Sequence, residues 1–328
     1  MSAHSIPVRS PMSNQIRSLN VLRDLPAIAD LVELCFHSTM DQEGQQYIRQ
    51  MRRASREDHF LQWIQAGIET TSMPMTGYVW DDGDRIIGNI SIVPFHSKGK
   101  RIYLLANVAV HPEYRCRGIA RALTQQAMNY ARERHAQSIW LQVRDDNPIA
   151  LKLYYSMGFQ EQTSRTTWQT TSDSPIQDND GGVTISPRFS RFWLTQHTWL
   201  RQLYPDEITW YHTPDWETFG TGIKYWFYRL FIGYDVHQWA AQRNGNLQGV
   251  VSWFFTTREY DPLWLAVAPE VENSTVTALL LHARKHLTKG RSLSLDFPAG
   301  KNCDAIASAG FNPRRTLVWM HVDGETKS

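Results

Sequence analysis

The segment RCRGIA, residues 115–120, joins a strand-like run to a helix-like run and constrains this chain more than any other feature. Residues 102–110 before it are apolar on both faces, as in a strand that is covered on both sides, and residues 119–131 carry apolar side chains at helical spacing. Gly118 lets the backbone approach a ligand closely, and the free N–H groups and dipole of a helix start favour an anion. The two arginines add charge-assisted hydrogen bonds of about 1.5 to 3 kcal/mol each. The junction therefore predicts a diphosphate site that needs no metal.

A second motif follows the strand-like run Ser138–Val143. Asn147 is a typical N-cap, the proline after it is a typical first helical residue, and Gly158 is typical of a helix end. Ala150 and Tyr154 are four residues apart and share one helix face, so that the small side chain leaves room beside the phenol. The alternative interpretation of Tyr154 is a half-buried aromatic residue whose hydroxyl lies in water.

On these two motifs, residues from about Tyr103 to Trp168 resemble the GNAT superfamily of acetyl-CoA-dependent N-acetyltransferases. The resemblance implies acetyl-CoA as co-substrate, no metal, and direct attack by a primary amine in a ternary complex. It implies that Tyr154 is the catalytic acid that protonates the departing thiolate, and that backbone N–H on the Val108 strand polarises the thioester carbonyl. The cofactor-binding positions that it implies are Val108, Ala109, Val110, Arg115, Cys116, Arg117, Gly118, Ile119, Ala120, Arg121, Asn147 and Tyr154.

The general base is not identified by the sequence. Many members of the family place a carboxylate on the strand before the loop, whereas this chain has Leu105, Ala106 and Asn107 there. Deprotonating a lysine-like amine at pH 7 costs about 4.6 kcal/mol, against about 1 kcal/mol for an α-amine. The remaining candidates, of which none is favoured, are Asp41, Glu43, Asp145 and Asp146.

The residues before the loop complete one domain. Asn14–Leu19 predicts a strand, Asp24 a helix cap, Gln42–Met51 a second helix, and residues 78–94 a hairpin. We expect an α/β (α+β) domain over residues 14–169, with a mixed, mostly antiparallel sheet flanked by helices. Residues 1–13 are expected to form a flexible tail, because they lack an apolar run.

The second half of the chain repeats the first weakly. Residues 170–182 are polar and aperiodic and are predicted to be a linker. After it, residues 183–328 match the first half in order, which predicts a tandem arrangement with a degenerate second GNAT-like domain. The matched pairs are Gly88 with Gly249, Val108–Pro112 with Leu265–Pro269, and Gly158–Phe159 with Gly310–Phe311.

The second domain is expected to lack an active site. Glu272, Ser274 and Thr275 stand where the first domain has its two arginines and Gly118, and Ile306 stands in place of Tyr154. The aromatic run Lys224–Phe231 has two interpretations, a wall of the acceptor pocket or ordinary core packing.

Charge and cysteine content narrow the function classes. The chain has 34 basic and 32 acidic residues, so no nucleic-acid or membrane partner is indicated. Its 3 cysteines are unclustered, which argues against a disulfide framework or a zinc site and favours a reduced, cytoplasmic setting. The expected partner is a small-molecule or peptide amine. Two alternatives stay open, a non-catalytic acyl-CoA-binding sensor or scaffold and a mycothiol-synthase-like acetylation of a small amino compound.

Overall fold

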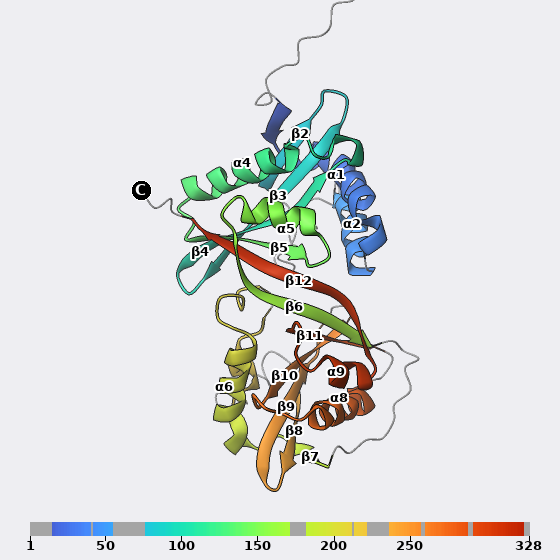
Figure 1. Ribbon diagram of the computed structural model, residues 1–328, viewed down its shortest axis with the longest axis vertical. Helices are drawn as coiled ribbons and strands as arrows, with labels where there is room; N and C mark the ends of the chain where they lie inside the picture. The colour runs from blue at the N-terminus through green and yellow to red at the C-terminus, as the bar shows by residue number, and fades with distance from the viewer. Residues whose placement is uncertain are drawn as a thin grey trace, which may run out of the picture. The chain divides into compact units, whose positions relative to one another are not determined.

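The computed structural model (Figure 1) describes residues 15–40, 42–54, 76–170, 182–211, 213–221, 236–256, 260–287 and 291–324. The chain forms two compact units. The first comprises Met1–Gln142, Ile149–Gln160 and Met320–Ser328, and the second comprises Val143–Pro148 and Glu161–Trp319.

The sheet of the first unit is antiparallel at one end and parallel at the other. Its strands lie in the order β1, β2, β3, β4 and β5, with the end of β12 next to β5. The first four pair antiparallel, and β4 pairs parallel with β5. Their bounds are β1 Ile16–Ser18, β2 Thr76–Asp81, β3 Ile86–Ser97, β4 Lys100–Val110, β5 Ser138–Arg144 and β12 Phe311–Asp323. The helices are α1 Val21–Phe36, α2 Gln42–Ala54, α4 Ile119–Glu133 and α5 Pro148–Tyr155.

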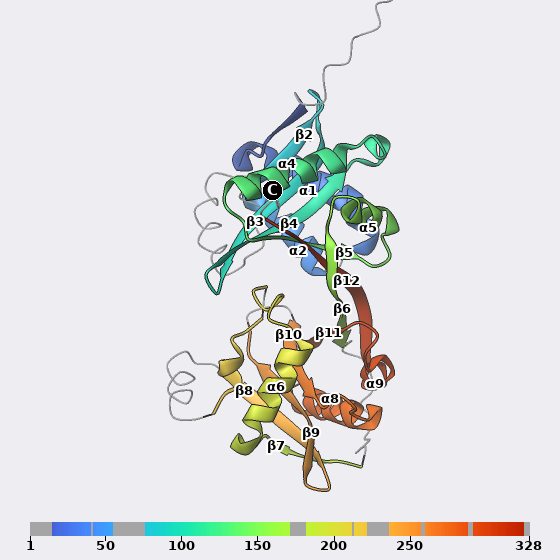
Figure 2. The same ribbon diagram turned by 60° about the vertical axis from the view of Figure 1, so that its left-hand side comes forward.

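Helices cover both faces of this sheet (Figures 1 and 2). A Cβ atom on Gly88 of β3 would lie 2.9 Å from Ile119 Cγ2 of α4, so α4 packs closely here because the residue is glycine. Asn89, the next residue, points to the other face, since side chains alternate along a strand. Its partner Ala109 belongs to the apolar core of α1 and α2. The two faces of β3 and β4 therefore meet different helices.

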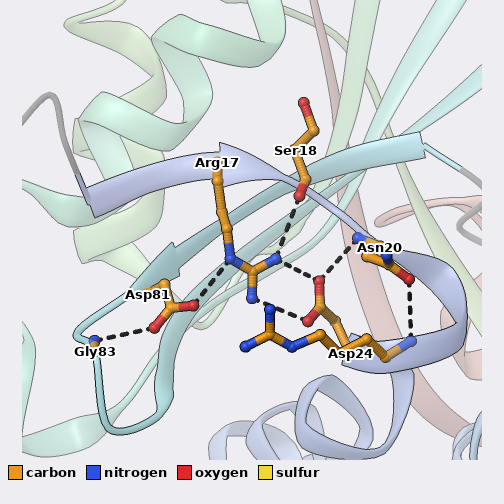
Figure 3. Close-up of polar contacts among 7 residues, drawn as sticks. Arg17, Ser18, Asn20, Asp24, Asp81 and Gly83 are labelled. Atoms are coloured by element: carbon orange, nitrogen blue, oxygen red, sulfur yellow. Dashed lines mark hydrogen bonds and ion pairs between the residues drawn. The ribbon is translucent and has the colours of Figure 1, made fainter.

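The start of α1 differs from the prediction (Figure 3). The helix begins at Val21 rather than at Asp24, and Asn20 is its N-cap, accepting from Arg23 N–H at 3.1 Å. The buried carboxylate of Asp24 reciprocates by accepting from Asn20 N–H at 2.8 Å, and it also binds Arg17 of β1. Asn20 and Asp24 form a reciprocal cap, so the apparent Asp-Leu-Pro cap lies inside the helix.

The second unit repeats this order of elements. The strands β7, β8, β9 and β10 pair antiparallel, and β10 pairs parallel with β11. The strand bounds are β6 Gln160–Thr170, β7 Thr184–Pro187, β8 Val236–Arg243, β9 Asn246–Phe254, β10 Tyr260–Val267 and β11 Ser292–Pro298. The helices are α6 Trp193–Leu203, α8 Asn273–Leu287 and α9 Cys303–Ser308. The expected fold class, a mixed and mostly antiparallel sheet flanked by helices, is confirmed.

The matched glycines of the two halves occupy equivalent places. Gly88 pairs with Val110 and Gly249 pairs with Val267. A Cβ atom on Gly249 would lie 2.9 Å from Leu279 Cδ1 of α8, the same crowding that α4 imposes on Gly88. The tandem arrangement expected from the weak repeat is thus present in the structure.

The boundaries of the units differ from the expected domain boundaries in two places. Strand β6 follows α5 in the chain, but from Glu161 onward it belongs to the second unit, where it pairs with β11. The chain from Met320 onward belongs to the first unit, where Gly324 N–H donates to Gln137 O at 3.0 Å. Each half therefore contributes its last strand, wholly or in part, to the other unit. The tail, residues 171–181 of the linker and the aromatic run 224–231 lie outside the described residues.

Candidate active site

The loop before α4 has the backbone of an anion site. Gly118 caps α4 in the left-handed conformation, with φ 82°, and a Cβ atom there would meet nothing within 4 Å. Glycine is therefore required by the backbone conformation and not by crowding. Ala122 N–H makes the first helical bond to Gly118 O, at 3.0 Å, which leaves the N–H groups of residues 119–121 without intrahelical acceptors. Cys116 also has a positive φ, 60°, and residues 115–118 are exposed.

Three arginines are anchored around this loop. Arg115 Nε donates to Val110 O at 3.2 Å, and an Arg117 terminal nitrogen donates to Glu113 O at 2.9 Å. An Arg121 terminal nitrogen donates to Ser156 Oγ of the turn after α5, at 2.6 Å. Since all three side chains are exposed, their charges surround a helix start that already favours an anion.

The two parallel strands of the first unit separate next to this loop. Pairing between β4 and β5 ends at Leu105 and Leu141, although β4 continues to Val110. The register of β4 on β3 shifts after Ala106, and Asn107 takes the left-handed conformation with φ 51°. Beyond Leu105 the described part of β5 pairs with no residue of β4, so residues 106–109 form a strand edge without a strand partner on that side, and Val110 O accepts from Arg115 Nε.

Tyr154 is more buried than the alternative interpretation required. Its side chain is 6% exposed and packs edge to face on Phe159, with ring centroids 5.8 Å apart. Burial raises the pKa of Tyr154 above its ordinary value, so the phenol is protonated at neutral pH. Ile149 at the other end of α5 is 79% exposed, and the buried side of this short helix is the one that carries Tyr154.

Asn147 and two of the base candidates lie in the second unit. Asn147 is exposed, and its N–H donates to Arg144 O at 3.1 Å. Asp146 binds Arg144 through two contacts of 2.9 and 2.6 Å, which lowers the pKa of the carboxyl and makes it a poorer base. Asp41 and the side chain of Glu43 lie outside the described residues. The contact of Asn147 with a cofactor stays a prediction.

The sequence did not assign a role to the polar residues behind the bulge of β4. Asn107 Nδ2 donates to Tyr47 Oη of α2 at 2.6 Å, and Asn89 Nδ2 donates to Asn107 O at 2.9 Å. The available signal was the residue type, because asparagine tolerates a positive φ better than most residues. In the sequence, Asn107 stands out only as a residue that is not a carboxylate.

The equivalent strand edge in the second unit is occupied by the chain itself. Pairing of β10 with β11 ends at Leu263 and Leu295. Beyond it, the N–H of Leu265, the residue matched to Val108, donates to Tyr204 Oη at 3.4 Å. This hydroxyl therefore takes the backbone donor that corresponds to the proposed thioester-binding N–H.

Tyr204 is buried and contacts two tryptophans and an arginine. It is 2% exposed and packs against Trp216 and Trp264, each with a centroid distance of 5.3 Å. The guanidinium of Arg165 lies over its ring at 4.6 Å and is itself bound to Asp296. Burial raises the pKa of the Tyr204 phenol, which stays neutral.

The other matched positions of the second unit also differ from the site in the first. Glu272 binds Arg243, Thr275 is 1% exposed, and Ile306 is fully buried. Glu272 places a negative charge where the first unit has Arg115, and a carboxylate repels an anion. That this unit has no active site stays a prediction.

The loop, the separated strands and the buried tyrosine all lie within the part of the chain that a known family matches. Residues 32–159 match the family model described as Acetyltransferase (GNAT) family, and the chain therefore carries a domain of the GNAT family.

Named relatives match part of the chain. It is 39% identical over 69 residues to the ribosomal protein bS18-alanine N-acetyltransferase of Escherichia coli strain K12, covering 21% of this chain and 47% of that enzyme. It is 34% identical over 87 residues to N-alpha-acetyltransferase 30 of Schizosaccharomyces pombe, covering 26% of this chain and 58% of that protein. The chain thus spans about half the length of the curated relatives it matches.

A solved structure resembles the whole chain. The GCN5-related N-acetyltransferase of Sphaerobacter thermophilus covers 95% of this chain and 97% of its own, with a TM-score of 0.56 and 14% identity. At this identity the likeness concerns the fold alone.

None of the described helices combines the length and apolar character that crossing a membrane requires. Within the described ranges, no three His, Cys, Asp or Glu side chains are grouped to hold a metal ion.

Proposed function

We propose that the protein is an N-acetyltransferase that moves the acetyl group of acetyl-CoA to a primary amine. The observation that carries the proposal is the free edge of β4 beside the Gly118 loop, because it offers backbone donors next to an anion site. The relatives named above, which are an alanine N-acetyltransferase and an N-alpha-acetyltransferase, support the same reaction class.

In this proposal, separate groups of the first unit bind the cofactor and donate the proton. The N–H groups of residues 119–121 and the anchored arginines would bind the diphosphate of CoA, and the edge of β4 at Val108 would bind the pantetheine arm and polarise the carbonyl. The amine nitrogen forms a bond to the acetyl carbon while the carbon–sulfur bond breaks, and Tyr154 donates its proton to the sulfur. The tyrosine regains a proton from solvent, and the acetylated nitrogen loses its surplus proton.

The test is release of the CoA thiol, measured with a thiol reagent while the amine and acetyl-CoA are varied together. Direct attack in a ternary complex predicts intersecting initial-velocity lines and no release of CoA before the amine is added. Parallel lines would contradict direct attack. Tight acetyl-CoA binding with no amine-dependent release would favour the sensor or scaffold instead.

We further propose one acetyl-CoA site per chain, since Tyr204 takes the equivalent donor in the second unit. Titration calorimetry of the intact chain measures this stoichiometry, and two sites per chain would contradict it.

A further inference from the structure

Four uncharged polar side chains meet where β4 bulges, on the face of the sheet that α1 and α2 cover. Two of them, Asn89 and Ser91 of β3, are fully buried, with 0% and 1% exposure. The other two, Tyr47 of α2 and Asn107 of β4, are half-buried and therefore reachable from solvent. Asn107, one of the two half-buried residues of this cluster, directly precedes Val108 in the chain.

Asn107 is fixed by its neighbours. Its backbone carbonyl accepts from Asn89 Nδ2 at 2.9 Å, and its side-chain amide donates to Tyr47 Oη at 2.6 Å and to Ser91 Oγ at 3.4 Å. Both N–H groups of the amide are directed at these two hydroxyls, so the side-chain oxygen is the remaining group. Among the described residues nothing donates to Asn107 Oδ1, and its position is preset by the left-handed backbone, φ 51°.

The carboxylates of α1, the helix over this face, are already paired. Asp30 and Glu33 bind Arg52 of α2 at 2.6 and 2.5 Å. Asp24 binds Arg17 at 2.6 Å. Near the bulge, the described part of the chain offers the neutral side-chain oxygen of Asn107. The titratable groups of α1 and α2 bonded to β4 here are Tyr47, whose Oη accepts from Asn107 Nδ2, and Cys35, whose Sγ donates to Val110 O at 3.3 Å.

Building on the proposed function, we infer that Asn107 Oδ1 receives the acceptor amine and that the site selects amines already neutral near pH 7, such as the α-amine of an amino-acid amide or peptide. A carbonyl oxygen accepts one N–H of a neutral amine and directs its lone pair at the acetyl carbon. It cannot take up a proton as a carboxylate does. The surplus proton passes to water after the carbon–nitrogen bond has formed.

The expected selectivity follows from the free-base fractions. With amine pKa values of about 7.8 and 10.4, the neutral fraction at pH 7 is about 300-fold larger for the α-amine than for a lysine-type amine. At pH 9 the same calculation gives about 25-fold. Selectivity that comes from the neutral fraction therefore falls more than tenfold between pH 7 and pH 9.

The experiment compares two small acceptors, alaninamide and Nα-acetyl-lysinamide, through CoA release at saturating acetyl-CoA. We expect kcat/KM at pH 7 to favour alaninamide by 100-fold or more, and the ratio to fall as the pH rises. Equal rates at pH 7 would overturn the inference while leaving the acetyltransferase reaction in place. Failure of both amines to release CoA would instead contradict the proposed function.

A variant tests the residue itself. Asn107→Asp keeps the shape and tolerates the positive φ, but it supplies a base. We expect the lysine-type amine to gain at least tenfold at pH 7 and the preference for alaninamide to narrow by the same factor. The matched control is Asn244→Asp, at a residue with φ 50° in the turn between β8 and β9, which should leave the ratio unchanged. An unchanged ratio and pH profile in folded Asn107→Asp would overturn the role of Asn107.

Discussion

Replacing Gly118 by glutamate should abolish acetyl-CoA binding. It should also lower the stability of the protein, and the same substitution at Gly99 should lower it by a similar amount. Gly118 and Gly99, which lies in the turn between β3 and β4, both have positive φ, 82° and 76°, and a Cβ atom on either would meet nothing within 4 Å. A left-handed non-glycine residue costs about 1 to 2 kcal/mol. Each variant should therefore melt roughly 2 to 8 °C below the parent chain, at about 2 to 4 °C per kcal/mol.

The two variants should differ in their response to acetyl-CoA. A ligand at 100 times its dissociation constant stabilises the native state by about 2.7 kcal/mol, or roughly 5 to 11 °C on the same scale. The parent and Gly99→Glu should show this increase in Tm by scanning fluorimetry. Gly118→Glu should not, because its carboxylate faces the diphosphate and its backbone no longer favours the left-handed turn. An undiminished increase in Gly118→Glu would refute the placement of the diphosphate at this loop.

Four further outcomes are expected. Tyr154→Phe should lower kcat at least tenfold and leave acetyl-CoA affinity nearly unchanged, because only the proton donor is lost; weaker binding with normal kcat would contradict the role. Arg17→Met should lower the free energy of unfolding by about 1 to 3 kcal/mol, since it leaves the carboxylate of Asp24, 2% exposed, without its cation. The pKa of Asp81 is lowered by Gly83 N–H and then by Arg17, so the stability it contributes is present above about pH 4 and is lost as the pH falls; denaturant titrations should show a smaller acid loss in Arg17→Met than in the parent chain. Tyr204→Phe should cost about 1 to 3 kcal/mol by leaving a buried N–H unpaired, while the stoichiometry of acetyl-CoA stays the same.

Local chemistry made much of the fold predictable. The strand before the loop, the Gly118 turn and the helix after it were predicted from residue type and periodicity, and the structure has β4, the left-handed glycine and α4 there. The weak repeat also located the second unit, because Gly88 and Gly249 are both needed where a helix packs closely on a strand. Residue type, periodicity and the matched glycines are local features, and they can be read from a single sequence.

The predicted start of α1 was wrong because local signals compete there. Asp24 followed by a leucine and a proline resembles a helix start, but Asn20 caps α1 and Asp24 closes the cap from within the helix. The division predicted at residue 169 follows the polar composition of the next segment, and the contacts of β6 group it with the second unit from Glu161 onward. Composition marks where a chain is exposed, and it does not say which sheet a strand joins.

By itself the sequence determined the anion loop, the order of elements and the candidate acid Tyr154, because each depends on residues that are close along the chain. Only the tertiary structure showed that Asn107 meets Tyr47 and Asn89, and that Tyr204 takes the N–H of Leu265. These partners are 18, 60 and 61 residues apart, and a hydrogen bond between them leaves no periodic pattern. Whether a strand edge stays free or is filled is decided by the packing of the elements around it.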